Sequence, residues 1–126
     1  MPIFLRSLLK IVCLSAVLCG CAVQQTATVL SLAPAAETPE LTLSSPLELQ
    51  LGTGYHRTLK QGSRWTQIGS VPQGAVYKPS RDVFTIEGAH IHEAYLVVDK
   101  GMLVGFYLPA ERSYADLGQR LPIFFQ

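Results

Sequence analysis

The chain has 126 residues, with ten Lys and Arg against nine Asp and Glu, so its formal net charge is +1. A balance this close to neutral excludes a basic face that would follow nucleic acid, and no polybasic cluster favours binding to anionic lipid. Hydrophobic residues make up 48% of the chain, and the first group of them lies at the N-terminus.

Residues 1–20 have the layout of a secretory signal peptide. Two basic side chains, Arg6 and Lys10, precede an apolar run over Ile11–Leu18, and the small residue Gly20 follows. The apolar run is too short to cross a bilayer, so the pattern predicts a cleaved signal rather than a membrane-spanning helix.

The tetrapeptide Leu18-Cys19-Gly20-Cys21 resembles the lipobox of bacterial lipoproteins. The resemblance implies that the Cys21 thiol receives a diacylglyceryl group, that the signal is cut before Cys21, and that the new N-terminus is acylated. Ala22 follows where an Asp would retain the protein in the inner membrane, which implies a lipid anchor in the outer membrane, facing the periplasm or the cell surface. The alternative is a soluble secreted protein whose leftover thiol would itself need an explanation in an oxidising compartment.

Processing changes the composition of the chain. Removal of Arg6 and Lys10 leaves eight basic against nine acidic side chains, so the net charge moves from +1 to −1. Cys13 and Cys19 leave with the signal, and Cys21 is acylated. No thiol then remains for a disulfide, a catalytic nucleophile or a zinc site, and the core alone must hold the fold.

Residues 21–46 are predicted to be the lipidated N-terminus followed by a disordered tether. Small, polar and proline residues dominate this stretch, and Val29–Leu32 is its only short apolar patch. Such a composition buries too little apolar surface to offset the entropy of ordering the chain. A tether of this length would reach at most about 80–90 Å when fully extended. The alternative is a loop that packs on the domain.

Residues 47–126 are predicted to form one small β domain. Short β-prone runs alternate with turn signals, such as Val71-Pro72-Gln73-Gly74, and no helical periodicity persists. The fold class is therefore all-β, as a small, mostly antiparallel barrel or strongly curled sheet of six to seven strands. The expected strands are Leu47–Leu51, Arg64–Val71, Ala75–Lys78, Val83–Glu87, Ile91–Asp99, Met102–Leu108 and Leu121–Phe125.

The strongest hairpin turns at Lys100-Gly101. A two-residue loop there pairs Tyr95 with Phe106, an aromatic cross-strand pair, whereas a three-residue loop shifts the pairing by one. Gly105 stands among bulky neighbours and indicates a bend or a close approach of another part of the chain.

Tyr95, Phe106 and Tyr107 form the candidate interaction patch. Tyrosine offers apolar area with a polar tip, which suits a binding surface. The alternative is that these residues only build the wall of the barrel.

His90 and His92 are weak candidates for a metal site. Residues two apart on a strand point to the same side, so both rings could reach one ion. A third ligand is missing nearby, and His56 is the only other histidine. We therefore predict no metal, no cofactor and no catalytic residue, since no nucleophile elbow or phosphate-binding glycine loop occurs.

Two functions remain open at this stage. The first is a non-catalytic structural or interaction lipoprotein that docks onto a protein partner in an envelope assembly. The second is an immunity or inhibitor lipoprotein that binds a toxin or a cell-wall enzyme.

Overall fold

The computed structural model describes residues 22–34 and 38–126. All regular structure within these ranges is β, and they contain no helix long and apolar enough to span a membrane. The predicted signal peptide over residues 1–20 and the lipidation site at Cys21 lie outside the described residues.

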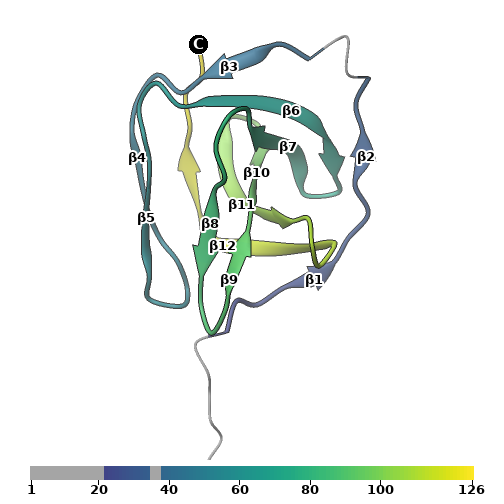
Figure 1. Cartoon of the computed structure of the whole chain (residues 1–126), viewed down its shortest axis with the longest axis vertical. Coiled ribbons are helices and arrows are strands. Elements are labelled where there is room, and N and C mark those ends of the chain that lie inside the picture. The colour runs from purple at the N-terminus through teal and green to yellow at the C-terminus, as the bar shows by residue number, and fades with distance from the viewer. Residues whose placement is uncertain (1–21, 35–37) are drawn as a thin grey trace, which may run out of the picture.

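Twelve strands occur in the described part of the chain (Figure 1). They are β1 (Thr26–Ala27), β2 (Ser31–Leu32), β3 (Glu40–Thr42), β4 (Leu47–Gln50), β5 (His56–Leu59), β6 (Arg64–Val71), β7 (Gly74–Pro79), β8 (Thr85–Glu87), β9 (Ile91–Glu93), β10 (Tyr95–Asp99), β11 (Met102–Leu108) and β12 (Ser113–Pro122).

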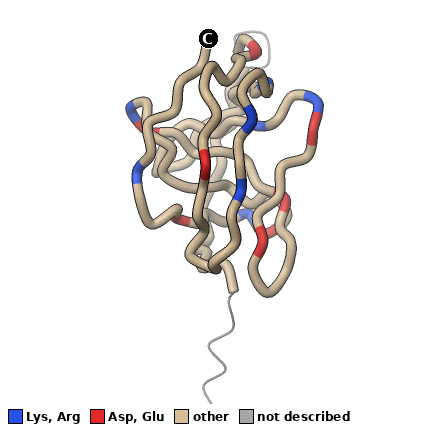
Figure 2. The backbone as a smooth tube through the Cα atoms, turned by 90° about the vertical axis from the view of Figure 1, so that its left-hand side faces the viewer, with Lys and Arg blue, Asp and Glu red and all other residues tan. Residues whose placement is uncertain are grey.

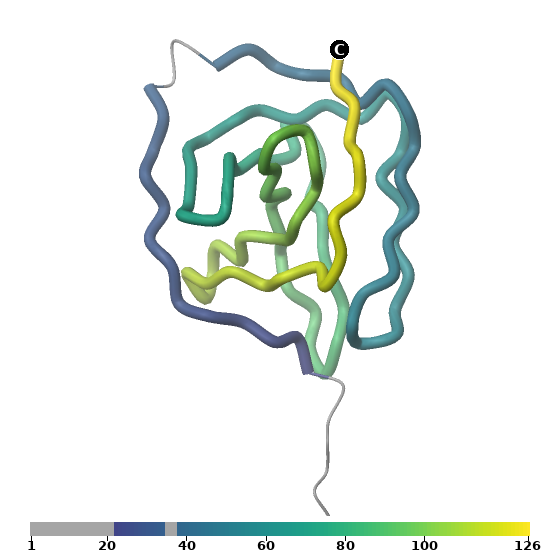
Figure 3. The backbone as a smooth tube through the Cα atoms, turned by 180° about the vertical axis from the view of Figure 1, so that it is seen from behind, coloured from purple at the N-terminus to yellow at the C-terminus, as the bar shows by residue number. Residues whose placement is uncertain are grey.

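Eight of the strands form one antiparallel sheet. Its order is β1-β12-β11-β10-β7-β6-β2, and β3 also pairs with β6. The sheet curls strongly upon itself, as the views from the front and from behind show (Figures 1 and 3). Two separate hairpins, β4–β5 and β8–β9, complete the fold. The predicted fold class, an all-β strongly curled antiparallel sheet, is confirmed.

The segment 22–34, here called the N-terminal strap, connects the two edges of this curled sheet. β1 pairs with β12 through Thr26 and Tyr114, and β2 pairs with β6 through Ser31 and Ser70. Only three residues separate β1 from β2, so a single short piece of chain joins both edges. The prediction of a disordered tether over residues 21–46 is therefore wrong for 22–34 and 38–46.

Backbone and side-chain contacts hold the strap in place. The Thr28 amide donates to the Arg112 carbonyl at 3.2 Å, and the Ala33 amide donates to the Ile68 carbonyl at 2.8 Å. The hydroxyl of Ser113, which is buried, donates to the side-chain carbonyl of Gln25. Most of these bonds involve backbone groups, which are the same in every residue. A polar composition therefore did not reveal that this segment is ordered.

Residues 38–46 also belong to the fold, so the predicted domain boundary at Leu47 is wrong. β3 pairs with β6, and Leu43 is fully buried in the core. The Gln126 amide donates to the Thr42 carbonyl at 2.8 Å, and the Ser44 amide donates to the Phe124 carbonyl at 2.9 Å. The C-terminal residues thus fix this segment from its other side.

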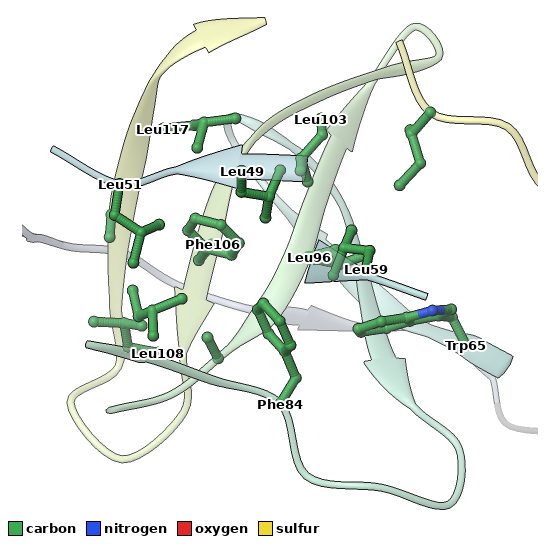
Figure 4. Packing of buried hydrophobic residues seen from close by; sticks show 14 of the residues in the cluster. Leu49, Leu51, Leu59, Trp65, Phe84, Leu96, Leu103, Phe106, Leu108 and Leu117 are labelled. Carbon is green, nitrogen blue, oxygen red and sulfur yellow. The ribbon is translucent and has the colours of Figure 1, made fainter. Parts of the chain in front are cut away.

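Two apolar clusters lie on opposite faces of the sheet. The first, here called the main core, fills the space between the sheet and the two hairpins (Figure 4). At its centre, Phe84 lies between Trp65 and Phe106, with ring centroids 5.9 and 6.0 Å away. The second, here called the tyrosine cluster, comprises Val71, Val76, Tyr95, Val97, Val104, Tyr107 and Tyr114, with Leu30, Ile68 and Met102 packed against it.

The β10–β11 hairpin has the predicted two-residue loop, with positive φ at Lys100 (50°) and Gly101 (75°). Next to the turn, Val98 pairs with Leu103, but Val97 pairs with Gly105. Val104 is therefore an extra residue in the strand, a β-bulge that shifts all later pairs by one. The predicted pairing of Tyr95 with Phe106 is wrong for this reason.

Gly105 allows a close approach, as the sequence indicated. A Cβ built there would lie 2.5 Å from the Ala115 carbonyl oxygen and 2.5 Å from the Tyr114 hydroxyl. The Tyr114 side chain lies across the glycine and occupies the space that a larger residue would need.

Gly105→Ala is expected to destabilise the chain beginning at Ala22 by about 1–3 kcal/mol, because the new methyl group displaces Tyr114. Urea unfolding followed by tryptophan fluorescence measures the change. Gly52→Ala is the control, since its Cβ would meet nothing within 4 Å. Equal midpoints for the two variants would contradict the close packing at Gly105.

Gly69→Ala is expected to detach β2 from β6, because the added Cβ would collide with the Ser31 carbonyl. Amide hydrogen exchange at Ala33 should accelerate by at least about tenfold, which corresponds to roughly 1.4 kcal/mol. Amides of β10 and β11 should keep their protection. Ser70→Ala is the control, because Ser70 pairs with Ser31 and already carries a Cβ. Unchanged exchange at Ala33 would contradict closure by the strap.

Candidate functional site

The predicted interaction patch is not one surface. Phe106 is 1% exposed and belongs to the main core, whereas Tyr95 and Tyr107 belong to the tyrosine cluster on the opposite face. The inclusion of Phe106 in an exposed patch is therefore wrong, and both tyrosines are buried as well. The bulge at Val104 places Tyr95 opposite Tyr107.

Three tyrosines form a row across neighbouring strands. Tyr95 on β10 pairs with Tyr107 on β11, which pairs with Tyr114 on β12. The rings of Tyr95 and Tyr107 lie 6.3 Å apart, and the Lys78 ammonium lies 5.8 Å from the Tyr95 ring centroid. Leu30 of the strap packs against the same cluster. The row is therefore an internal packing surface beneath the N-terminal strap.

The raised pKa values of two tyrosine hydroxyls in this row agree with a packing role. Burial raises the pKa of Tyr114, and its hydrogen bond to Asp116 raises that pKa further. The Tyr114 hydroxyl is 3.0 Å from the Val104 carbonyl and 2.9 Å from the Asp116 carboxylate. Burial and the nearby Glu93 raise the pKa of Tyr95. Both hydroxyls hold their protons at neutral pH.

The two histidine candidates lie on the β8–β9 hairpin. His90 is exposed in its turn, and His92 Nδ1 lies 2.6 Å from a carboxylate oxygen of Glu111, in the β11–β12 loop. Within residues 22–34 and 38–126, no group of three His, Cys, Asp or Glu side chains could hold a metal ion. The contact between His92 and Glu111 therefore links the β8–β9 hairpin to the β11–β12 loop.

A cavity of about 280 Å³ opens at the end of the molecule where the strap begins. Two polar side chains that line it, Thr53 between β4 and β5 and Asp116 in β12, already form hydrogen bonds within the protein. Thr53 donates to the Glu87 carbonyl at 2.6 Å, and Asp116 accepts from Tyr114 at 2.9 Å and from the Gly118 amide at 2.8 Å. The cavity is lined by Ala22, Val23, Gln24, Leu51, Gly52, Thr53, Ile86, Phe106, Ala115, Asp116, Leu117 and Gly118.

Four of the six large apolar side chains that are exposed in the described residues lie on two surfaces that sequence reasoning missed. On the strap, Val29 is 79% exposed and Leu32 is 77% exposed, while Leu30 between them is turned inward. At the end with the cavity, Tyr55 is 45% exposed and Ile91 is 72% exposed. The apolar run Val29-Leu30-Ser31-Leu32 within a polar stretch was the signal available for the first surface.

The chain matches no protein-family model, no curated protein and no solved structure.

The raised pKa of Tyr114 predicts how stability depends on pH. The unfolded tyrosine loses its proton near its ordinary pKa of 10.0, below the pKa in the folded state. The unfolded chain then binds fewer protons, so the free energy of unfolding falls as the pH rises above about 10.

Tyr114→Phe tests this dependence. The variant should lose about 1 kcal/mol at pH 7 with its hydrogen bonds, yet lose less additional stability between about pH 8 and 11 than the parent chain. Urea unfolding at both pH values gives the comparison. Tyr55→Phe, at an exposed side chain, is the control. An equal alkaline loss in the parent and in Tyr114→Phe would contradict the assignment.

Proposed function

We propose that this chain is a lipoprotein anchored in the outer membrane through acyl groups on Cys21, and that it is a non-catalytic interaction component of an envelope assembly. One observation carries the proposal. Val29 and Leu32, two large aliphatic side chains, project into solvent from the strap, and β2 is an edge strand of the sheet.

An ordered edge with exposed aliphatic side chains suits a protein partner. Backbone groups on the outer side of β2 can pair with an added strand. Leu32 of β2 and Val29, which lies between β1 and β2, would then give the contact its side-chain specificity. Burying Val29 and Leu32 would contribute roughly 1.5–3 kcal/mol each. Because β1 and β2 already hold the strap on both sides, little of this gain is lost to ordering the chain.

The position of the anchor restricts where the partner lies. A strap packed on the sheet cannot serve as a long tether, and two or more acyl chains hold a protein stably in a bilayer. The eight residue-to-residue steps from Cys21 to Val29 span at most about 25–30 Å. A partner that contacts Val29 therefore lies close to the membrane surface, which favours a resident envelope protein over a diffusible ligand.

Photo-crosslinking in intact cells tests the proposal. A photoreactive amino acid replaces Leu32 in the full chain, and Val83, another exposed valine outside the strap, is the control position. We expect one dominant adduct from position 32, none of the same mass from position 83, and loss of that adduct when Val29→Asp is added.

The identity of the adduct decides between the two functions. A resident envelope protein supports the proposal, whereas a secreted toxin or a cell-wall enzyme supports the immunity or inhibitor function. Equal, weak labelling from positions 32 and 83 would overturn the assignment of the strap as the binding edge.

A further inference from the structure

Two turns meet at the end of the molecule where the strap begins. One is residues 52–55 between β4 and β5, and the other is residues 88–91, which comprise the β8–β9 turn and Ile91, the first residue of β9. Thr53 donates to the Glu87 carbonyl at 2.6 Å, which joins the turns, and Ala22 lines the same cavity as Thr53. Figures 1 and 3 show both hairpins ending at the end of the fold where the purple N-terminal strap begins. This end is called the anchor pole below.

The two turns share an unusual composition. Their sequences, Gly52-Thr53-Gly54-Tyr55 and Gly88-Ala89-His90-Ile91, contain no Lys, Arg, Asp or Glu. In Figure 2 the tips of both hairpins are accordingly tan, without the blue or red of charged residues. Each turn presents one large side chain to solvent, Tyr55 (45% exposed) and Ile91 (72% exposed). Glu87 directly precedes Gly88 and pairs with Ile91.

We infer that the anchor pole lies against the phospholipid surface, with Tyr55 and Ile91 inserted among the headgroups. This inference rests on the proposed lipid anchor. Cys21 directly precedes Ala22, and consecutive Cα atoms lie about 3.8 Å apart, so acyl groups on Cys21 bring the bilayer to this end of the domain.

The chemistry of the pole defines the kind of lipid surface it takes. Tyrosine is enriched where membrane and water meet, and an exposed isoleucine gains by leaving water. With no basic side chain in either turn, the contact does not depend on anionic lipid. A neutral, zwitterionic phospholipid surface is sufficient.

Site-directed spin labelling of the acylated full-length product tests the inference. The mature chain has no other free thiol once Cys21 is acylated, so Tyr55→Cys, Ile91→Cys and the control Phe124→Cys each carry one nitroxide. Phe124 is also exposed, but it lies near the C-terminus at the opposite end of the view in Figure 1. The variants are placed in phosphatidylcholine vesicles, and collisions with oxygen and with a water-soluble nickel chelate are measured.

We expect positions 55 and 91 to gain oxygen accessibility and lose nickel accessibility on the vesicles, while position 124 stays as in water. Adding anionic phosphatidylglycerol should leave this pattern unchanged. Vesicle flotation and the mass of the N-terminal peptide separate the two ideas. An acylated protein that floats while positions 55 and 91 stay as hydrated as 124 overturns the orientation alone. An unacylated protein that stays in solution overturns the anchor and the orientation together.

A second measurement compares amide hydrogen exchange in both turns with and without vesicles. Vesicles should slow this exchange in the parent protein and in Phe124→Asp, but not in the double variant Tyr55→Asp with Ile91→Asp. Retained slowing in the double variant would contradict insertion of these side chains.

Discussion

The fold depends on one constraint, which is that a single short segment pairs with both edges of the curled sheet. Without it, β12 and β6 would each expose unpaired backbone groups, and the tyrosine row would lose the cover that Leu30 provides. The small size of Gly69 is a condition for this closure, because any side chain there would meet the Ser31 carbonyl. The order of the N-terminal residues and the shape of the curled sheet are thus one property.

This closure also orients the surfaces of the domain. The strap begins at the anchor pole and passes along β12 to β6, so Val29 and Leu32 lie beside the sheet while the uncharged turns lie at its end. Under the proposed function, the pole contacts lipid and the strap edge contacts a neighbouring protein. Both contacts use ordered elements, which keeps the entropy cost of binding low.

Much of the fold could be predicted from the sequence, because alternation and turn residues report local structure. Arg64–Val71 and Met102–Leu108 form strands with the predicted bounds, and Gly105 marks a close approach. The bulge at Val104 could not be predicted, since it depends on packing between strands rather than on the local pattern. It moved Tyr95 from Phe106 to Tyr107. Phe106 and Tyr107 are consecutive residues of one strand and point to opposite faces, so the predicted patch is not one surface with or without the bulge. The strap was missed because its order comes from distant backbone partners, which composition does not record.

The direction of the strap has a mechanical consequence. Its first residue is the one nearest the proposed anchor, so tension that pulls the domain away from the bilayer acts on the start of the strap. Val23, which packs against the main core, would carry that load first, followed by the bond between Ser113 and Gln25 and the short pairing of β1, before β2 on the far edge. Detachment from this end would break these contacts one after another and would expose the tyrosine cluster, which Leu30 of the strap covers.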